Sequence, residues 1–216
     1  MKILEYGQNW FIEDQLDDEL LSDIKIFFDK HLDYFYKDKE GYSTTGDNTE
    51  QYWIKRKGKK PFYYRNKDYE NIERRFREGI HGRLKAASLL QFDDIQLRQS
   101  TAWTVIGEEG SYHTIHNHTD GVMGGVSVVL YLNVPESEHD DIISNSIFLV
   151  LHTDPSSHFV KYGCPSYRHV KPEVGTLLIF PYHVPHGTYP QTKGIRQTFN
   201  VDYDFYAEEK SSINYS

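Results

Sequence analysis

A series of short apolar runs after residue 94 is the feature that most constrains the fold. Four of these runs are rich in β-branched or aromatic residues, and each is bounded by Gly, Pro, Asn or Asp. They are GVSVVLYLNV (125–134), SIFLVLH (146–152), GTLLIF (175–180) and RQTFNVDY (196–203). Extended runs that contain Ile95, Leu97, Trp103 and Val105 come before them. Several short strands separated by turn signals are typical of an antiparallel sandwich or barrel.

The first 94 residues have a different pattern, which predicts a strand, a helix, a loop and a second helix. Residues 37–60 are polar, contain glycine and show no periodicity, so we expect a loop there. Asp17 or Asp18 is a suitable cap for the first helix. Apolar residues repeat every three or four positions in both helices. They are Leu20, Leu21, Ile24, Phe27, Phe28 and Leu32 in the first helix, and Tyr69, Ile72, Phe76, Ile80 and Leu84 in the second.

The sequence therefore predicts an α+β protein that is mainly β. We expect one domain over residues 1–216, with an α-rich flanking region (1–94) and a β core (95–205). The formal net charge of −8 argues against nucleic-acid binding by the whole surface. A single cysteine, Cys164, and the lack of a long apolar segment lead us to expect a soluble, cytoplasmic protein with no membrane contact. The basic run KRKGKK (55–60) is expected to be a solvated loop, the alternative being a contact to an acidic substrate or a nucleic-acid backbone.

The stretch HTIHNHTDG (113–121) contains the residues most suited to chemistry. If this stretch is a strand, His116, His118 and Asp120 share one face. Two histidines and one carboxylate form the facial triad of non-haem Fe(II) oxygenases, so we expect a metal site. Its remaining ligand must come from another segment, and the stretch 180–200 offers His183 and His186.

The same second stretch contains a candidate anion site. Arg196 follows His186 by ten residues, and Thr198 lies on the same strand face as Arg196. A guanidinium beside a hydroxyl suits the distal carboxylate of a dicarboxylate co-substrate. A zinc hydrolase would leave this pair without a role. The other histidines lack partners at ligand spacing, so we expect structural roles for His113, His139, His152, His158 and His169.

Four motifs in order resemble those of the 2-oxoglutarate (2OG) and Fe(II)-dependent dioxygenases, and more narrowly a bacterial and phage branch of that superfamily. They are HNH (116–118), VLYLNVP (129–135), FPYHVPHG (180–187) and RQTFN (196–200). The resemblance covers about residues 101–203. It departs from the branch at Thr119, where the branch has proline.

The resemblance implies a jelly-roll (double-stranded β-helix) core that binds Fe(II), 2OG and O2, with ascorbate as a possible aid. It implies His118 and His186 as iron ligands, and it leaves either Asp120 or His116 as the third. His183 is expected to face away from the metal. Arg196 would pair with the distal carboxylate of 2OG, helped by Thr198 and Tyr131. The catalytic set would be His118, Asp120, His186 and Arg196, in a hydroxylase that converts 2OG to succinate.

Two other classes of protein stay open at this point. One is a cupin-like metal enzyme that does not use 2OG, which predicts no effect of losing Arg196. The other is a non-enzymatic β-sandwich binding module, which predicts no stoichiometric metal. The primary substrate stays open among a peptide, a metabolite and a nucleotide. We expect residues 152–168 to form a lid, and Trp103, Asn133 and Asn200 are candidates to line the cavity.

Overall fold

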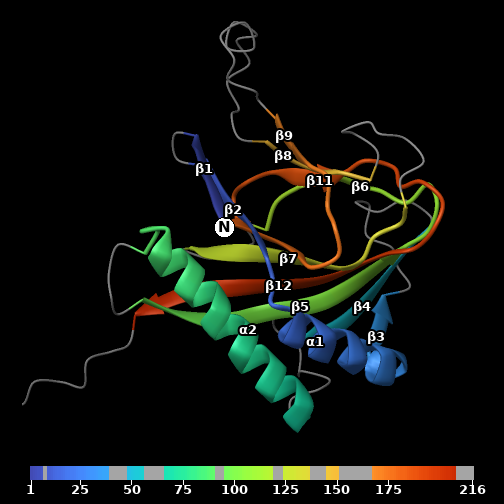
Figure 1. Cartoon of the computed structure of the whole chain (residues 1–216), viewed down its shortest axis with the longest axis horizontal. Coiled ribbons are helices and arrows are strands. Elements are labelled where there is room, and N and C mark those ends of the chain that lie inside the picture. The colour runs from blue at the N-terminus through green and yellow to red at the C-terminus, as the bar shows by residue number, and fades with distance from the viewer. Residues whose placement is uncertain are drawn as a thin grey trace, which may run out of the picture.

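Two antiparallel sheets form the core of the chain in the computed structural model (Figure 1). The structure describes residues 1–6, 9–38, 48–55, 66–90, 95–118, 124–136, 145–150 and 167–207. The large sheet has the strand order β1-β2-β10-β7-β12-β5-β4-β3, and the small sheet has the order β6-β11-β8-β9. The strands of the large sheet are β1 (Lys2–Tyr6), β2 (Asn9–Gln15), β3 (Tyr36–Asp38), β4 (Thr49–Lys55), β5 (Ile95–Gly107), β7 (Gly125–Asn133), β10 (Thr176–Pro181) and β12 (Arg196–Ala207). The small sheet contains β6 (His113–His116), β8 (Ile147–Val150), β9 (Tyr167–Val170) and β11 (His186–Thr188).

Both predicted helices are present. Helix α1 spans Asp18–His31 and is followed by the short 3-10 helix η1 (Leu32–Tyr34), and α2 spans Lys67–Ala86. The side chain of Asp17 caps α1 by accepting a hydrogen bond from the backbone N–H of Leu20 at 2.9 Å. Asn66 caps α2 in the same way. None of the described helices is long and apolar enough to cross a membrane.

The large sheet is covered on both faces, which explains its continuous apolar strands. The two helices lie on one side of it and the small sheet on the other (Figure 1). In β7, Val128 and Leu130 pack in the core under the helices, while Val129 and Tyr131 pack in the core under the small sheet. Each strand residue faces the layer opposite to that of its neighbour.

Strand β12 has one apolar face and one polar face. Phe199, Val201 and Tyr203 lie in the helix-side core, where the ring of Phe199 contacts those of Phe28 and Phe76. The intervening residues Arg196, Thr198, Asn200 and Asp202 line a cavity on the other face. This alternation places polar side chains between the two sheets without opening the core beneath the helices.

The predicted loop over residues 37–60 was wrong in part. Residues 49–55 form β4, which pairs with β5 and places Trp53 opposite Trp103. Polar residues occupy much of this strand, so the local pattern gave no periodic apolar signal. Pairing along β5 supplies the backbone hydrogen bonds, and the inward face of β4 lines the cavity with Gln51 and Trp53. Residues 56–60 of the basic run lie outside the described residues, as do residues 152–166 of the expected lid.

Candidate metal and co-substrate site

Three histidines converge at one end of the cavity between the sheets. His116 ends β6, and its backbone pairs with that of His186 at the start of β11. His118 lies just beyond β6, where its backbone N–H donates to the carbonyl of Tyr182 at 3.0 Å. One ring nitrogen from each of these three histidines lies within 4.8 Å of the others. The strand predicted through this stretch ends at His116, yet His116 and His118 still meet.

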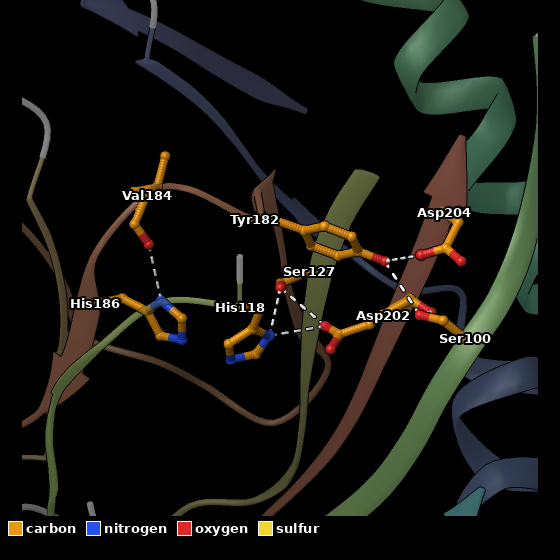
Figure 2. A network of polar contacts seen from close by, with 8 residues as sticks. All are labelled: Ser100, His118, Ser127, Tyr182, Val184, His186, Asp202 and Asp204. Carbon is orange, nitrogen blue, oxygen red and sulfur yellow. Dashed lines mark hydrogen bonds and ion pairs between the residues drawn. The ribbon is translucent and has the colours of Figure 1, made fainter. Parts of the chain in front are cut away.

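The tautomer of His118 follows from its neighbours in Figure 2. The single hydroxyl proton of Ser127 is donated to Oδ1 of Asp202 at 2.9 Å. Nδ1 of His118 lies 2.9 Å from the same carboxylate oxygen and 2.8 Å from Oγ of Ser127. Both of these oxygens can accept, so Nδ1 must carry the imidazole proton. The lone pair of Nε2 is then left for a ligand.

His186 and His116 are oriented by the same principle. Nδ1 of His186 donates to the carbonyl of Val184 at 3.0 Å, and Nδ1 of His116 donates to that of Thr114 at 2.8 Å. Burial lowers the pKa of both imidazoles, and the pKa of His186 is lowered further by its two histidine neighbours. Neutral imidazoles with a fixed Nδ1 proton are the form that ligates a metal through Nε2.

This donor set fits a divalent transition metal such as Fe(II). Imidazole nitrogen is a good ligand for iron, and a hydrogen bond to the far nitrogen is the usual support for such a ligand. His183 is exposed and its ring nitrogen bonds Oδ1 of Asn9, so it faces away from the cluster as expected. Asp120 lies outside the described residues.

A candidate anion site lies in the same cavity, which has a volume of about 390 Å³. Arg196 is only 4% exposed, and its Nη2 donates to Oγ1 of Thr188 at 3.2 Å. Its Nη1 has no hydrogen-bond partner among the described residues, and neither has the hydroxyl of Tyr131. Burial raises the pKa of Tyr131 to about 12, so its phenol remains a donor at neutral pH. Unpaired buried donors around a guanidinium are suited to an incoming carboxylate.

Thr198 occupies the position expected for it. It lines the cavity on β12 directly opposite Tyr131 on β7, and its Oγ1 accepts a hydrogen bond from Nδ2 of Asn200 at 2.9 Å. Of the other expected lining residues, Trp103 and Asn200 line the cavity. Asn133 instead donates to the carbonyl of Ile195 at the surface.

Two residues of this site were not recognised in the sequence. His113 lines the cavity beside His116, and its Nε2 is buried with no partner in the described structure. Burial lowers the pKa of His113 to about 3, so this imidazole is neutral. Asp202, behind His118, is the second. Its signal was present in the sequence, because Asp202 follows Arg196, Thr198 and Asn200 at intervals of two and therefore shares their strand face.

The part of the cavity beside His118 is aromatic. Trp53 and Trp103 stack with their ring centroids 5.3 Å apart, and the ring of Trp103 lies 5.7 Å from that of His118. Gln51 and Thr101, on the same two strands, also line this part. The floor of the cavity thus runs from the histidines across β5 to β4.

Comparison with known proteins agrees with this geometry. Residues 101–202 match the family model described as "Putative 2OG-Fe(II) oxygenase". The match covers slightly less than half of the chain, and over this segment the chain is similar to that family. The match indicates an oxidoreductase that uses Fe(II), 2OG and O2. A search of curated proteins found no match.

Solved 2OG-Fe(II) oxygenases share the fold of almost the whole chain. A prolyl-4-hydroxylase from Pseudomonas putida is 15% identical, with a TM-score of 0.60 over 92% of this chain and 94% of that one. A 2OG-Fe(II) oxygenase family protein from Burkholderia pseudomallei is 12% identical, with a TM-score of 0.62 over 90% and 84% of the two chains. HygX from Streptomyces hygroscopicus, solved with nickel and 2OG bound, is 14% identical, with a TM-score of 0.56 over 90% and 82%. The predicted jelly-roll core is confirmed by these similarities.

Proposed function

We propose that this protein is a 2OG-Fe(II) oxygenase, and within that family a hydroxylase, in which His116, His118 and His186 hold the iron and Arg196 holds the distal carboxylate of 2OG. When bound, iron with 2OG and O2 supplies the oxidation of a substrate C–H bond, coupled to conversion of 2OG to succinate and carbon dioxide. The observation that carries this proposal is the buried, half-partnered guanidinium of Arg196 in the same cavity as three convergent imidazoles.

The choice of His116 over Asp120 as third ligand rests on the histidine geometry. The ring centroids of His116 and His186 are 4.4 Å apart, and those of His116 and His118 are 5.4 Å apart. The Nδ1 proton of His116 is already bonded to a carbonyl, which leaves its other nitrogen available. We therefore expect Co(II) affinity to fall strongly in His116→Ala and to stay within about threefold of wild type in Asp120→Ala.

The residues around Arg196 have distinct tasks in co-substrate binding. The guanidinium binds the distal carboxylate, and the Tyr131 hydroxyl donates to the same group. Thr188 orients the guanidinium through the 3.2 Å hydrogen bond to Nη2. His113, neutral at physiological pH, lines the same cavity beside His116, and its buried Nε2 has no partner among the described residues, so this ring can donate one N–H to the co-substrate. Together these groups exclude water and fix the orientation of 2OG before the substrate arrives.

The primary substrate is proposed to bind over the part of the cavity that Trp53 and Trp103 line. Its reacting carbon would lie near the histidines, and its adjacent surface would pack on the indoles of Trp103 and Trp53. Aromatic floors of this kind contribute large contact area with few rotatable bonds. The side-chain amide of Gln51 and the hydroxyl of Thr101 are placed to bind polar edges of that substrate.

The test is succinate formation by the purified enzyme with Fe(II), 2OG and ascorbate. We expect slow turnover without primary substrate, and its loss in Arg196→Ala and His186→Ala. His183→Ala is the matched control, because this histidine lies three residues from His186 but is exposed and bonded to Asn9. Full turnover in Arg196→Ala would favour the cupin-like alternative. A wild-type protein that binds neither metal nor 2OG would refute the proposal.

A further inference from the structure

We infer that Asp202 is a positioning residue for the metal centre, where it supplies through His118 the negative charge that a directly bound carboxylate supplies in a facial triad. This inference rests on the proposed function, because it requires a metal ion at the three imidazoles. In a facial triad the carboxylate touches the metal. Here, among the described residues, the ligand set contains only imidazoles, and the nearest carboxylate lies behind one of them.

The contacts of Asp202 fix both the position and the tautomer of His118. Oδ1 of Asp202 accepts from Nδ1 of His118 at 2.9 Å and from the hydroxyl of Ser127 at 2.9 Å. The side chains are 13% exposed for Asp202 and 15% exposed for His118. Two hydrogen bonds, one from Ser127 of β7 and one from His118 beyond the end of β6, therefore hold the carboxylate against the imidazole (Figure 2). Such a partner orients the ring and raises the basicity of the free nitrogen.

The charge of Asp202 also points to a cation at this site. In the part of the chain that the structure describes, its only ion-pair partner is His118. A largely buried carboxylate without a cation is costly, because its desolvation is not repaid by the attraction of an opposite charge. A divalent metal on Nε2 of His118 would place positive charge on the other side of the same imidazole. Asp202 and the metal would then stabilise each other across the ring.

The neighbouring carboxylate Asp204 is a natural comparison. It lies two residues further along β12 and is 7% exposed as a residue. It accepts a hydrogen bond from the hydroxyl of Tyr182 at 3.1 Å and pairs with Arg98 at 3.5 Å. Asp204 has no described contact with the three histidines, so its loss perturbs the same strand without touching a ligand.

The experiment measures the affinity of the full chain for Co(II) alone, by calorimetry and by the visible absorption of the bound ion. Asp202→Asn removes the charge but keeps the size of the side chain, and we expect affinity to fall about 10- to 100-fold. Ser127→Ala removes one of the two hydrogen bonds and should weaken binding by a smaller factor. Asp204→Asn should bind within about twofold of wild type. Far-ultraviolet circular dichroism of each metal-free variant checks that it is folded.

Testing Asp202→Asn again in a variant that lacks His118 shows whether Asp202 acts through His118 or only supports the fold. In His118→Asp a carboxylate replaces the imidazole, and adding Asp202→Asn to it should cause no further loss of affinity. Equal losses in the two backgrounds would overturn the inference, as would wild-type affinity in Asp202→Asn or an equal loss in Asp204→Asn. If Asp202→Asn does not fold, unchanged affinity in Ser127→Ala would overturn it. Because no 2OG is present, these outcomes are distinct from failure of the proposed function, which requires that the wild-type protein itself bind no metal or no 2OG.

Discussion

Replacing Arg196 by methionine should move co-substrate affinity and protein stability in opposite directions. Methionine fills similar space but cannot bind a carboxylate. Truncating one partner of a buried charged pair costs about 2–5 kcal/mol of binding free energy. At about 1.4 kcal/mol per decade, the Kd for 2OG should rise roughly 30- to 4,000-fold.

The effect on stability follows from the unpaired Nη1 of Arg196. A buried donor with no partner costs about 1–3 kcal/mol, and Arg196→Met removes that cost in the protein without 2OG. For a chain of this size each kcal/mol shifts Tm by about 2–4 °C, so the metal-free variant should melt a few degrees higher than wild type. Arg83→Met is the contrasting control, because Nε of Arg83 pairs with Asp14 at 2.7 Å and its loss should lower Tm.

Two measurements on the same samples test this reasoning. Calorimetry with the Ni(II)-loaded protein gives the Kd for 2OG, and scanning calorimetry gives Tm with and without 2OG. At 100 times its Kd, 2OG should stabilise the wild type by about 2.7 kcal/mol, and the same concentration should leave the variant almost unchanged. A Kd within threefold of wild type would refute the assignment of Arg196. If Arg196→Met lowered Tm as much as Arg83→Met does, the inference that the Arg196 guanidinium is an unpaired anion-binding group would be refuted.

Three further predictions concern other parts of the molecule. Phe199→Ala should lower the free energy of unfolding by about 3–5 kcal/mol in urea melts, because this ring joins both helices to the sheet; a loss below 1 kcal/mol would contradict that packing. Gly187→Ala should weaken Co(II) binding, because a Cβ would lie 2.6 Å from the Phe148 ring and 2.8 Å from the His113 carbonyl and so displace β11; unchanged affinity would show that β11 adapts. The pKa of His113 is lowered by burial to about 3 from an ordinary 6.5, so unfolding takes up a proton between these values. The metal-free protein should therefore lose stability as pH falls from 6.5, and urea melts at pH 7.5 and 5 should show a smaller loss in His113→Gln.

The sequence predicted those parts of the fold in which local pattern and tertiary position agree. The apolar run of β7 indicated a strand, and the spacing in α1 and α2 indicated one buried face each; the structure adds that β7 is covered on both faces. Strand β4 was missed because its order depends on pairing with β5, which lies 40 residues further along the chain and is invisible to a local pattern. Propensity gives little information about a strand that is stabilised by its neighbours.

The candidate site was predicted through its residue types and missed where it depends on spatial neighbours. His118, His186, Arg196 and Thr198 were named from their residue types and spacing, and Tyr131 from the family resemblance. The pairing of β6 with β11 and of β7 with β12 brings them to one cavity. The spacing did not indicate that β6 ends at His116 and that His118 lies beyond it. The contact between His118 and Asp202 spans 84 residues, and only the folded sheets bring the two together.

The two faces of β12 couple the integrity of the core to the alignment of the site. Because side chains alternate along a strand, a slip of one residue would turn Phe199 and Val201 toward the cavity and Arg196 and Asp202 toward the helices. Such a slipped form would expose apolar rings and bury charge, and both changes would make its free energy higher than that of the native register. A molecule with intact aromatic packing is thereby also one with a correctly registered site. Near-ultraviolet circular dichroism of the core and Co(II) affinity should then be lost in a single unfolding transition.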